Sequence, residues 1–220
     1  MIRRYNFLLS LSFIALLSAG TATAASDSKP VGIGSGDQMS ADFMVDGEKV
    51  SISRNQDNAN TIDEKFIKTS RPCPPFCIQP AVLAPGVETI AELEMIKYIQ
   101  AMHNGEPVLV QDSRTPDWHE RGYIPGTVSI PWTSLATKGG ASIFDISEIM
   151  LEQFGVAEEE GIFKFKNAKT LVMYCNGMWC GQSPAAIKTL LNFGYPAHKL
   201  KWYRGGMQDW EVLGLTVVQK

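Results

Sequence analysis

Apolar and polar positions follow two alternating patterns from about residue 87 onward. Short apolar runs, which are typical of strands buried on both faces, occur at 108–110 and 170–174, and a last strand is predicted at 200–203. Between them, apolar residues recur at helical spacing, as at Ile90, Leu93, Ile96 and Ile99, then at 146–154 and 184–193. Strands that alternate with helices indicate an α/β fold with a central, mainly parallel sheet flanked by helices.

Several polar residues mark where these helices begin and end. Thr89-Ile90-Ala91-Glu92 has capping-box spacing and predicts a helix start at Thr89, and Gly105 predicts its end. Ser183 followed by Pro184 predicts an N-cap and a first helical position. The acidic run at 158–160 is expected to be a solvated loop or helix end.

Residues 25–86 are less regular and predict an N-terminal extension before a domain at 87–220. The stretch 26–40 is small, polar and glycine-rich, which predicts a flexible segment. Two apolar runs on either side of Asp46-Gly47 predict a small β-hairpin. A proline-rich link containing Cys73 and Cys77 follows it.

Residues 1–24 have the features of a secretory signal peptide. Arg3 and Arg4 precede an apolar run at 7–17, and Ala22-Thr23-Ala24 supplies a cleavage pattern. The apolar run is short for a membrane span. We therefore expect an exported, periplasmic protein, cleaved near Ala24 and without a membrane anchor afterwards. Export would place all four cysteines in an oxidising compartment.

Composition narrows the functional classes. The 220 residues include 20 Lys and Arg against 23 Asp and Glu, a net charge of −3. Since there is no basic excess to neutralise phosphates, we expect no nucleic-acid partner. Four cysteines are too few for a disulfide scaffold of this size.

Cys175 is the candidate nucleophile because it ends a predicted strand just before a predicted helix. Backbone N–H groups and the helix dipole at such a position stabilise a thiolate, a persulfide or a bound oxyanion. Gly177 and Gly181 allow the backbone angles of a tight loop. An inert, half-buried cysteine is the alternative interpretation. The predicted loop residues are Asn176, Gly177, Met178, Trp179, Cys180, Gly181, Gln182 and Ser183.

Several blocks in order along the chain resemble the rhodanese family. The first is an Asp-x-Arg strand end at Asp112 and Arg114, followed by Gly122-Tyr123-Ile124-Pro125-Gly126-Thr127. The second comprises Tyr174-Cys175, Ser183-x-x-Ala186, Gly194-Tyr195 and Gly205-Gly206-x-x-x-Trp210. Over residues 87–219 the resemblance implies a rhodanese-like domain in which Cys175 carries a persulfide. It implies supporting rather than catalytic roles for Asp112 and Arg114.

Two features depart from the family pattern. The loop between Cys175 and Ser183 is two residues longer than usual, and Gln182 stands where a basic residue is common. No Lys or Arg occurs from 175 to 183. Longer loops in the superfamily are associated with phosphate chemistry, which requires an arginine for bidentate oxyanion binding. We therefore rank phosphatase activity low among the candidate functions.

The other cysteines leave alternatives open. Cys180 is either a resolving thiol for Cys175, a packing residue, or half of a permanent disulfide. Cys73 and Cys77 are expected to form a local disulfide, with exchange with the loop as a functional alternative. A zinc site built from all four is a minor possibility. His103, His119 and His198 lack metal-ligand spacing, and we expect His119 at the surface.

The sequence predicts a periplasmic sulfurtransferase that needs no cofactor or metal. Its partners would be a small sulfur donor, thiosulfate or a persulfide, and a thiol or protein acceptor. One alternative is a thiol–disulfide or sulfur-redox protein that cycles the Cys175/Cys180 pair. The other is a non-catalytic binding module on the same fold.

Overall fold

The computed structural model describes residues 29–219. The predicted signal peptide at 1–24, with its cleavage site, lies outside these residues. Within 29–219 no helix has both the length and the apolar character needed to cross a lipid bilayer.

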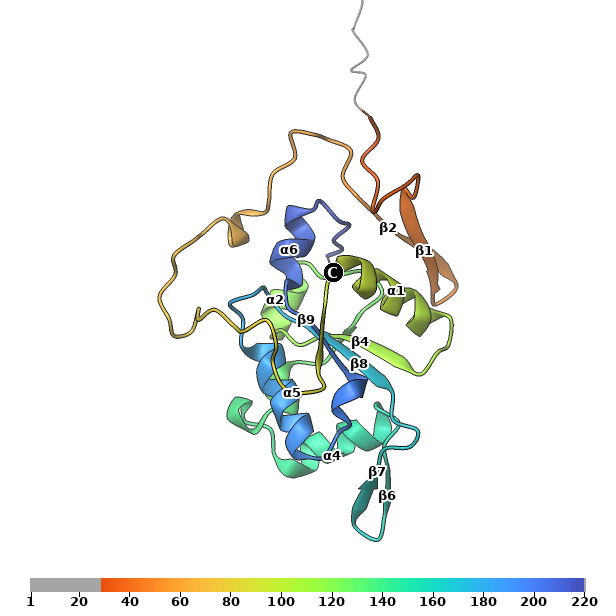
Figure 1. The fold of residues 1–220 in the computed structure, drawn as a ribbon, viewed down its shortest axis with the longest axis vertical. Helices are drawn as coiled ribbons and strands as arrows, with labels where there is room; N and C mark the ends of the chain where they lie inside the picture. Colours follow the sequence, from red (N-terminus) through yellow and green to blue (C-terminus); the bar gives the residue numbers. More distant parts are fainter. Residues whose placement is uncertain (1–28, 220) are drawn as a thin grey trace, which may run out of the picture.

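A five-stranded parallel sheet forms the centre of the molecule (Figure 1). The three predicted strands are confirmed, and two further strands at the edges are only three and two residues long. In spatial order the strands are β3 (Glu88–Ile90), β9 (Leu200–Tyr203), β8 (Thr170–Tyr174), β4 (Val108–Asp112) and β5 (Val128–Ser129).

Helices cover both faces of this sheet, which explains why its central strands are mostly apolar. The helices are α1 (Glu92–His103), α2 (Pro116–Glu120), α3 (Trp132–Leu135), α4 (Ile143–Glu152), α5 (Gln182–Asn192) and α6 (Gly206–Val212). Successive strand residues point to opposite faces. Thus Val172 packs with α1 and α6 in one core cluster, whereas Leu171 packs with α4 and α5 in the other.

Two predicted helix starts were wrong. Helix α1 begins at Glu92 with Ala91 as N-cap, because Thr89 is paired in strand β3; Leu93 is consequently exposed. Helix α5 begins at Gln182 with Gly181 as N-cap, so Ser183 lies inside the first turn. The ends marked by glycine are confirmed, since Gly105 and Gly194 follow α1 and α5 with positive φ.

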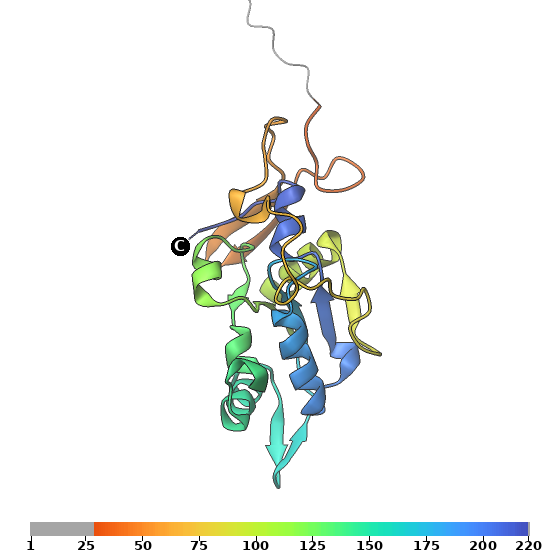
Figure 2. The same cartoon turned by 90° about the vertical axis from the view of Figure 1, so that its left-hand side faces the viewer.

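The predicted N-terminal hairpin is present as β1 (Ser40–Val45) and β2 (Glu48–Ser53), which meet at Asp46-Gly47. It packs on α1 through buried residues such as Phe43. A second hairpin, β6 (Ala157–Glu159) and β7 (Ile162–Lys164), projects from the end of the molecule away from the first (Figure 2). The acidic run is therefore an exposed strand and turn, not a loop or helix end.

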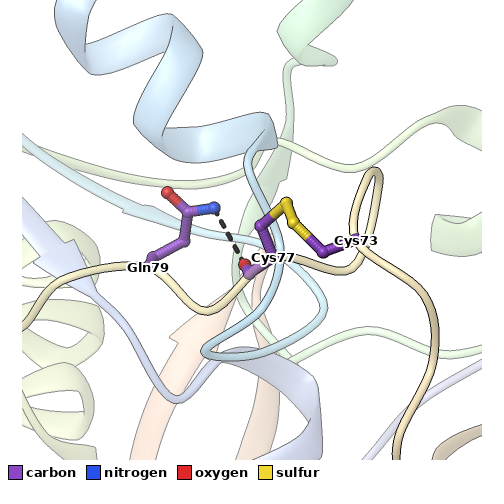
Figure 3. The surroundings of a disulfide bond; sticks show 3 residues. All are labelled: Cys73, Cys77 and Gln79. Carbon is purple, nitrogen blue, oxygen red and sulfur yellow. Dashed lines mark hydrogen bonds between the residues drawn. A yellow bond between two sulfur atoms is a disulfide. The ribbon is translucent and has the colours of Figure 1, made fainter.

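After β2 the chain passes around the molecule as a long irregular segment with a single turn of 3-10 helix at Glu64–Phe66 (Figure 1). Its residues 68–80 are called the strap below. The strap contains a disulfide between Cys73 and Cys77, whose Cα atoms are 4.6 Å apart (Figure 3). It then joins β3.

Candidate functional site

The site is built where β8 ends and α5 begins, at the carboxyl edge of the parallel sheet. Cys175 is the first residue after β8, and the loop 175–181 connects it to α5. The start of α6 holds this loop, because Met207 N donates to Cys175 O at 3.0 Å and Gln208 N donates to Asn176 O at 3.0 Å. Gly206 is required at this contact, since a Cβ there would overlap the Cys175 carbonyl oxygen.

The Cys175 sulfur is enclosed by polar groups of its own loop and of α5. The residue is only 1% exposed. Ser183 Oγ donates a hydrogen bond to Cys175 Sγ at 3.2 Å, and the Cys175 thiol donates to Cys180 O at 3.5 Å. Placing Ser183 inside the first turn, rather than at the N-cap, is what points its hydroxyl at the sulfur.

Cys180 lies in the same loop and is also a buried free thiol. Its Sγ is 3.6 Å from Gln182 Oε1. Burial acts to raise the pKa of Cys175, but hydrogen bonds from the Cys180 thiol, from Ser183 and from the Gly177 backbone outweigh it and lower that pKa from 9.0 to about 7. Burial and the neighbouring Cys175 raise the pKa of Cys180 well above its usual value. Cys175 is therefore the more acidic thiol of the pair and the one that ionises near neutral pH.

Asp112 and Arg114 form a buried ion pair at the end of β4, the strand next to β8. Arg114 Nη2 is 2.6 Å from Asp112 Oδ2 and donates to Gly122 O at 2.7 Å. His119 Nδ1 also lies 2.9 Å from Asp112 Oδ2, and His119 is 5% exposed, so its predicted surface position was wrong. The cluster ties β4 to the segment after α2.

The strap covers the outer side of the Cys175 loop. Gln79 N donates to Met178 O at 2.9 Å, and Phe76 packs edge-on against Trp179 with ring centroids 5.1 Å apart. The Arg71 guanidinium stacks on Trp179. Sequence reasoning missed this contact, because nothing in the pattern of residues 68–80 shows which part of the domain they touch.

The remaining predicted loop residues divide between the inside and the outside of the loop. Asn176 and Gly177 are buried, Met178 and Trp179 are half-buried against the strap, and Gly181 is exposed. Among residues 29–219, no three Cys, His, Asp or Glu side chains are grouped so as to hold a metal ion. The structure thus places Cys73–Cys77 and Cys175/Cys180 as two separate pairs, the first a disulfide and the second two free thiols.

Comparison with known proteins adds a family match. The family model described as "Rhodanese-like domain" matches residues 95–212. A curated relative, an HTH-type transcriptional regulator of Mycobacterium tuberculosis, is 27% identical over 136 residues, which are 62% of this chain and 47% of the relative. The chain thus spans about half the length of that relative.

Solved structures with a similar fold include two sulfurtransferases. A thiosulfate sulfurtransferase from Pseudomonas aeruginosa is 18% identical with a TM-score of 0.38, covering 60% of this chain and 20% of that chain. A human single-domain sulfurtransferase is 18% identical with a TM-score of 0.37, covering 57% and 96%. The BH2092 protein from Bacillus halodurans is 16% identical with a TM-score of 0.41, covering 60% and 77%.

Proposed function

This chain belongs to the rhodanese-like domain family, and from that premise we propose that it is a periplasmic sulfurtransferase that carries sulfane sulfur on Cys175. The observation that carries the proposal is the setting of this sulfur. It lies between a strand end and a helix N-terminus, receives a hydrogen bond from Ser183 and has a pKa of about 7. These features favour a thiolate and, by the same donors, a terminal persulfide anion.

The proposed reaction has two displacement steps. First, the Cys175 thiolate attacks the outer sulfur of a donor such as thiosulfate. The donor's S–S bond breaks, and sulfite leaves with the electron pair. Second, an acceptor thiolate attacks the outer sulfur of the Cys175 persulfide, and the Cys175 thiolate is regenerated as the leaving group. The low pKa of Cys175 serves both steps, since it favours the nucleophile in the first and the leaving group in the second.

A dithiol cycle is the second candidate, because Cys180 is a free thiol in the same loop. In that cycle Cys180 would attack the inner sulfur of the persulfide, release hydrosulfide and leave a Cys175–Cys180 disulfide. The raised pKa of Cys180 argues against this as the main route, since a thiol that stays protonated is a poor nucleophile. In the structure the Cys180 thiol donates to Gln182 Oε1 at 3.6 Å, which favours a supporting role for Cys180 rather than a nucleophilic one.

Turnover of single variants separates these functions. We expect transfer of sulfur from thiosulfate to a thiol by the mature chain, loss of turnover in Cys175→Ser, and retention of most turnover in Cys180→Ser. Loss in both variants, with a Cys175–Cys180 disulfide accumulating in the unmodified chain, would favour the dithiol cycle. If no donor supports turnover in the unmodified chain, the enzymatic proposal is wrong and a binding module remains.

A further inference from the structure

A groove of about 730 Å³ lies between the strap and the Cys175 loop. Strap residues including Lys68, Arg71 and Phe76 form one side, and Met178, Trp179 and Gln208 contribute to the other. Two cationic side chains line the groove and no Asp or Glu does, although the whole chain has a net charge of −3. The positive charge of the groove is therefore suited to an anionic group. Its aromatic rings and the Met178 thioether are suited to contact with the carbon skeleton of an organic ligand.

Arg71 is fixed in this groove by two aromatic rings. Its guanidinium carbon is 4.2 Å from the centroid of Phe76 and 4.2 Å from that of Trp179. Its Nη2 atom is buried and has no hydrogen-bond partner among the described residues. Because a buried donor without an acceptor is costly, above all on a charged group, an anionic acceptor that reached this atom would gain a charge-assisted hydrogen bond that the chain does not supply.

Two hydrogen bonds join the lining of the groove to the residue that follows the proposed nucleophile. Trp179 Nε1 donates to Gln208 Oε1 at 2.8 Å, and Gln208 N donates to the carbonyl of Asn176, the residue next to Cys175. The segment 175–183 has no Lys or Arg of its own. Arg71 is thus a cation that a distant part of the chain brings to this loop.

We propose that the groove is a subsite for the acceptor, that Arg71 binds its anionic group, and that the acceptor class is a carboxylate-bearing organic thiol. This inference rests on the proposed function, since the acceptor is the compound that removes sulfur from Cys175. A guanidinium donates to a carboxylate through charge-assisted hydrogen bonds, and Phe76 and Met178 cover the carbon chain. The sulfonate of thiosulfate has the same oxyanion chemistry, so the donor is tested in parallel.

The kinetic test uses two thiols that differ only in the polar end. We compare 3-mercaptopropionate with 2-mercaptoethanol as acceptors, and thiosulfate is varied separately. In Arg71→Met we expect KM for 3-mercaptopropionate to rise about tenfold or more, with kcat and the KM for 2-mercaptoethanol little changed. Arg71→Lys keeps the charge but not the planar guanidinium, so its KM for 3-mercaptopropionate should lie between those of the unmodified chain and Arg71→Met. The control is Arg121→Met, because Arg121 also stacks on a tryptophan, Trp118, but is exposed and outside the groove.

A binding measurement separates this inference from the proposed function. On a Cys175→Ser background, calorimetry with 3-(methylthio)propionate and 2-(methylthio)ethanol reports the groove without any chemistry. We expect the carboxylate to bind more tightly and Arg71→Met to remove the difference.

If Arg71→Met raises only the KM for thiosulfate, the donor occupies the groove and the acceptor assignment is wrong. If a persulfide forms but neither KM nor binding depends on Arg71, the inference fails while the proposed function stands. If binding depends on Arg71 but no persulfide forms on Cys175, the groove binds a carboxylate and the proposed function fails.

Discussion

Cys175 and Cys180 share one loop, yet their environments give the two thiols different acidities. Hydrogen bonds from Ser183, Cys180 and the Gly177 backbone converge on the Cys175 sulfur and lower its pKa to about 7. Cys180 is buried beside that sulfur, so a second negative charge is disfavoured and its pKa is raised. The reactive form of the site at neutral pH is a single thiolate with a neutral thiol next to it.

The first prediction concerns the pH dependence of Cys175 alkylation. Because only the thiolate reacts, the rate with iodoacetamide should rise with pH around a midpoint of about 7. Ser183→Ala removes one donor to the thiolate and should shift the midpoint upward by about one pH unit. Cys180→Ala should shift it in the same direction, whereas Cys180→Ser, which keeps a hydroxyl donor, should shift it less. A midpoint near 9 in the unmodified chain would contradict this description.

The second prediction concerns the buried Asp112, which contacts both Arg114 and His119. Burial acts to raise the pKa of Asp112, but these partners outweigh it and lower that pKa. Asp112→Asn leaves Arg114 as an uncompensated buried charge and should reduce the free energy of unfolding by about 3–5 kcal/mol. Asp117→Asn is the control, because Asp117 is exposed, and it should change that free energy by less than about 0.5 kcal/mol. Urea denaturation measures both, and equal effects would refute the role of the cluster.

At the scale of elements, the loop and α5 enclose the sulfur, and the strap covers the outer side of the loop. A sulfur donor must contact Cys175 to react, so a residue that is 1% exposed requires the covering elements to open first. Arg204 is the main side-chain anchor of the strap, donating to Gln79 O at 2.8 Å and to Pro80 O at 3.2 Å. Opening therefore depends on this anchor as well as on Phe76 and Trp179.

The third prediction follows from that anchor. Arg204→Met keeps the length of the side chain but removes its donors, so the strap should open more often. We expect the pH-independent limit of Cys175 alkylation to rise by about fivefold, with its pH midpoint unchanged. Lys188→Met on the exposed face of α5 should alter neither quantity. An unchanged limit in Arg204→Met would show that the strap does not control access to the sulfur.

The elements differ in how far local sequence patterns predict them. Strands β4 and β8 were predictable because burial on both faces makes most of their residues apolar, and β9 was predictable although Lys201 interrupts its apolar residues. Strands β3 and β5 are too short for any periodicity. Thr89 was misassigned as a cap because its pairing with Trp202 of β9 is a contact over more than a hundred residues. Local signals cannot report such pairing.

The site was predictable to the same extent. Cys175 and its loop follow from a strand end, glycines and a helix start, all of which are local in sequence. The positions of His119 on Asp112 and of Arg71 on Trp179 depend on how distant segments fold together. For this reason the sequence shows a loop without a cation, and only the structure shows the cation beside it.

At the scale of the whole molecule, the N-terminal extension is part of the folded core. Phe43, Ile52 and Phe66 belong to the same buried cluster as Ile96 and Trp210. The chain after α6 returns to β2, since Thr216 N donates to Ser53 O at 3.0 Å. Residues 29–86 thus complete one face of the domain as well as carrying the strap.

The fourth prediction tests this integration. Phe66 is 2% exposed and packs beside Trp118, so Phe66→Ala should lower the free energy of unfolding by about 3–5 kcal/mol in a single cooperative transition. Phe144→Ala is the control, because Phe144 is 85% exposed. A small effect at Phe66, or two separate transitions, would mean that the extension folds independently of the domain.

The central claim is that Cys175 carries transferable sulfur, and peptide-resolved mass spectrometry tests it most directly. The protein is gently reduced, freed of reductant, treated with thiosulfate and digested. We predict one additional sulfur on the Cys175 peptide, retained in Cys180→Ser and absent from Cys175→Ser. Loss of two hydrogens with a Cys175–Cys180 crosslink and no added sulfur would contradict the persulfide account, as would an unmodified Cys175 thiol with thiosulfate and with persulfide donors.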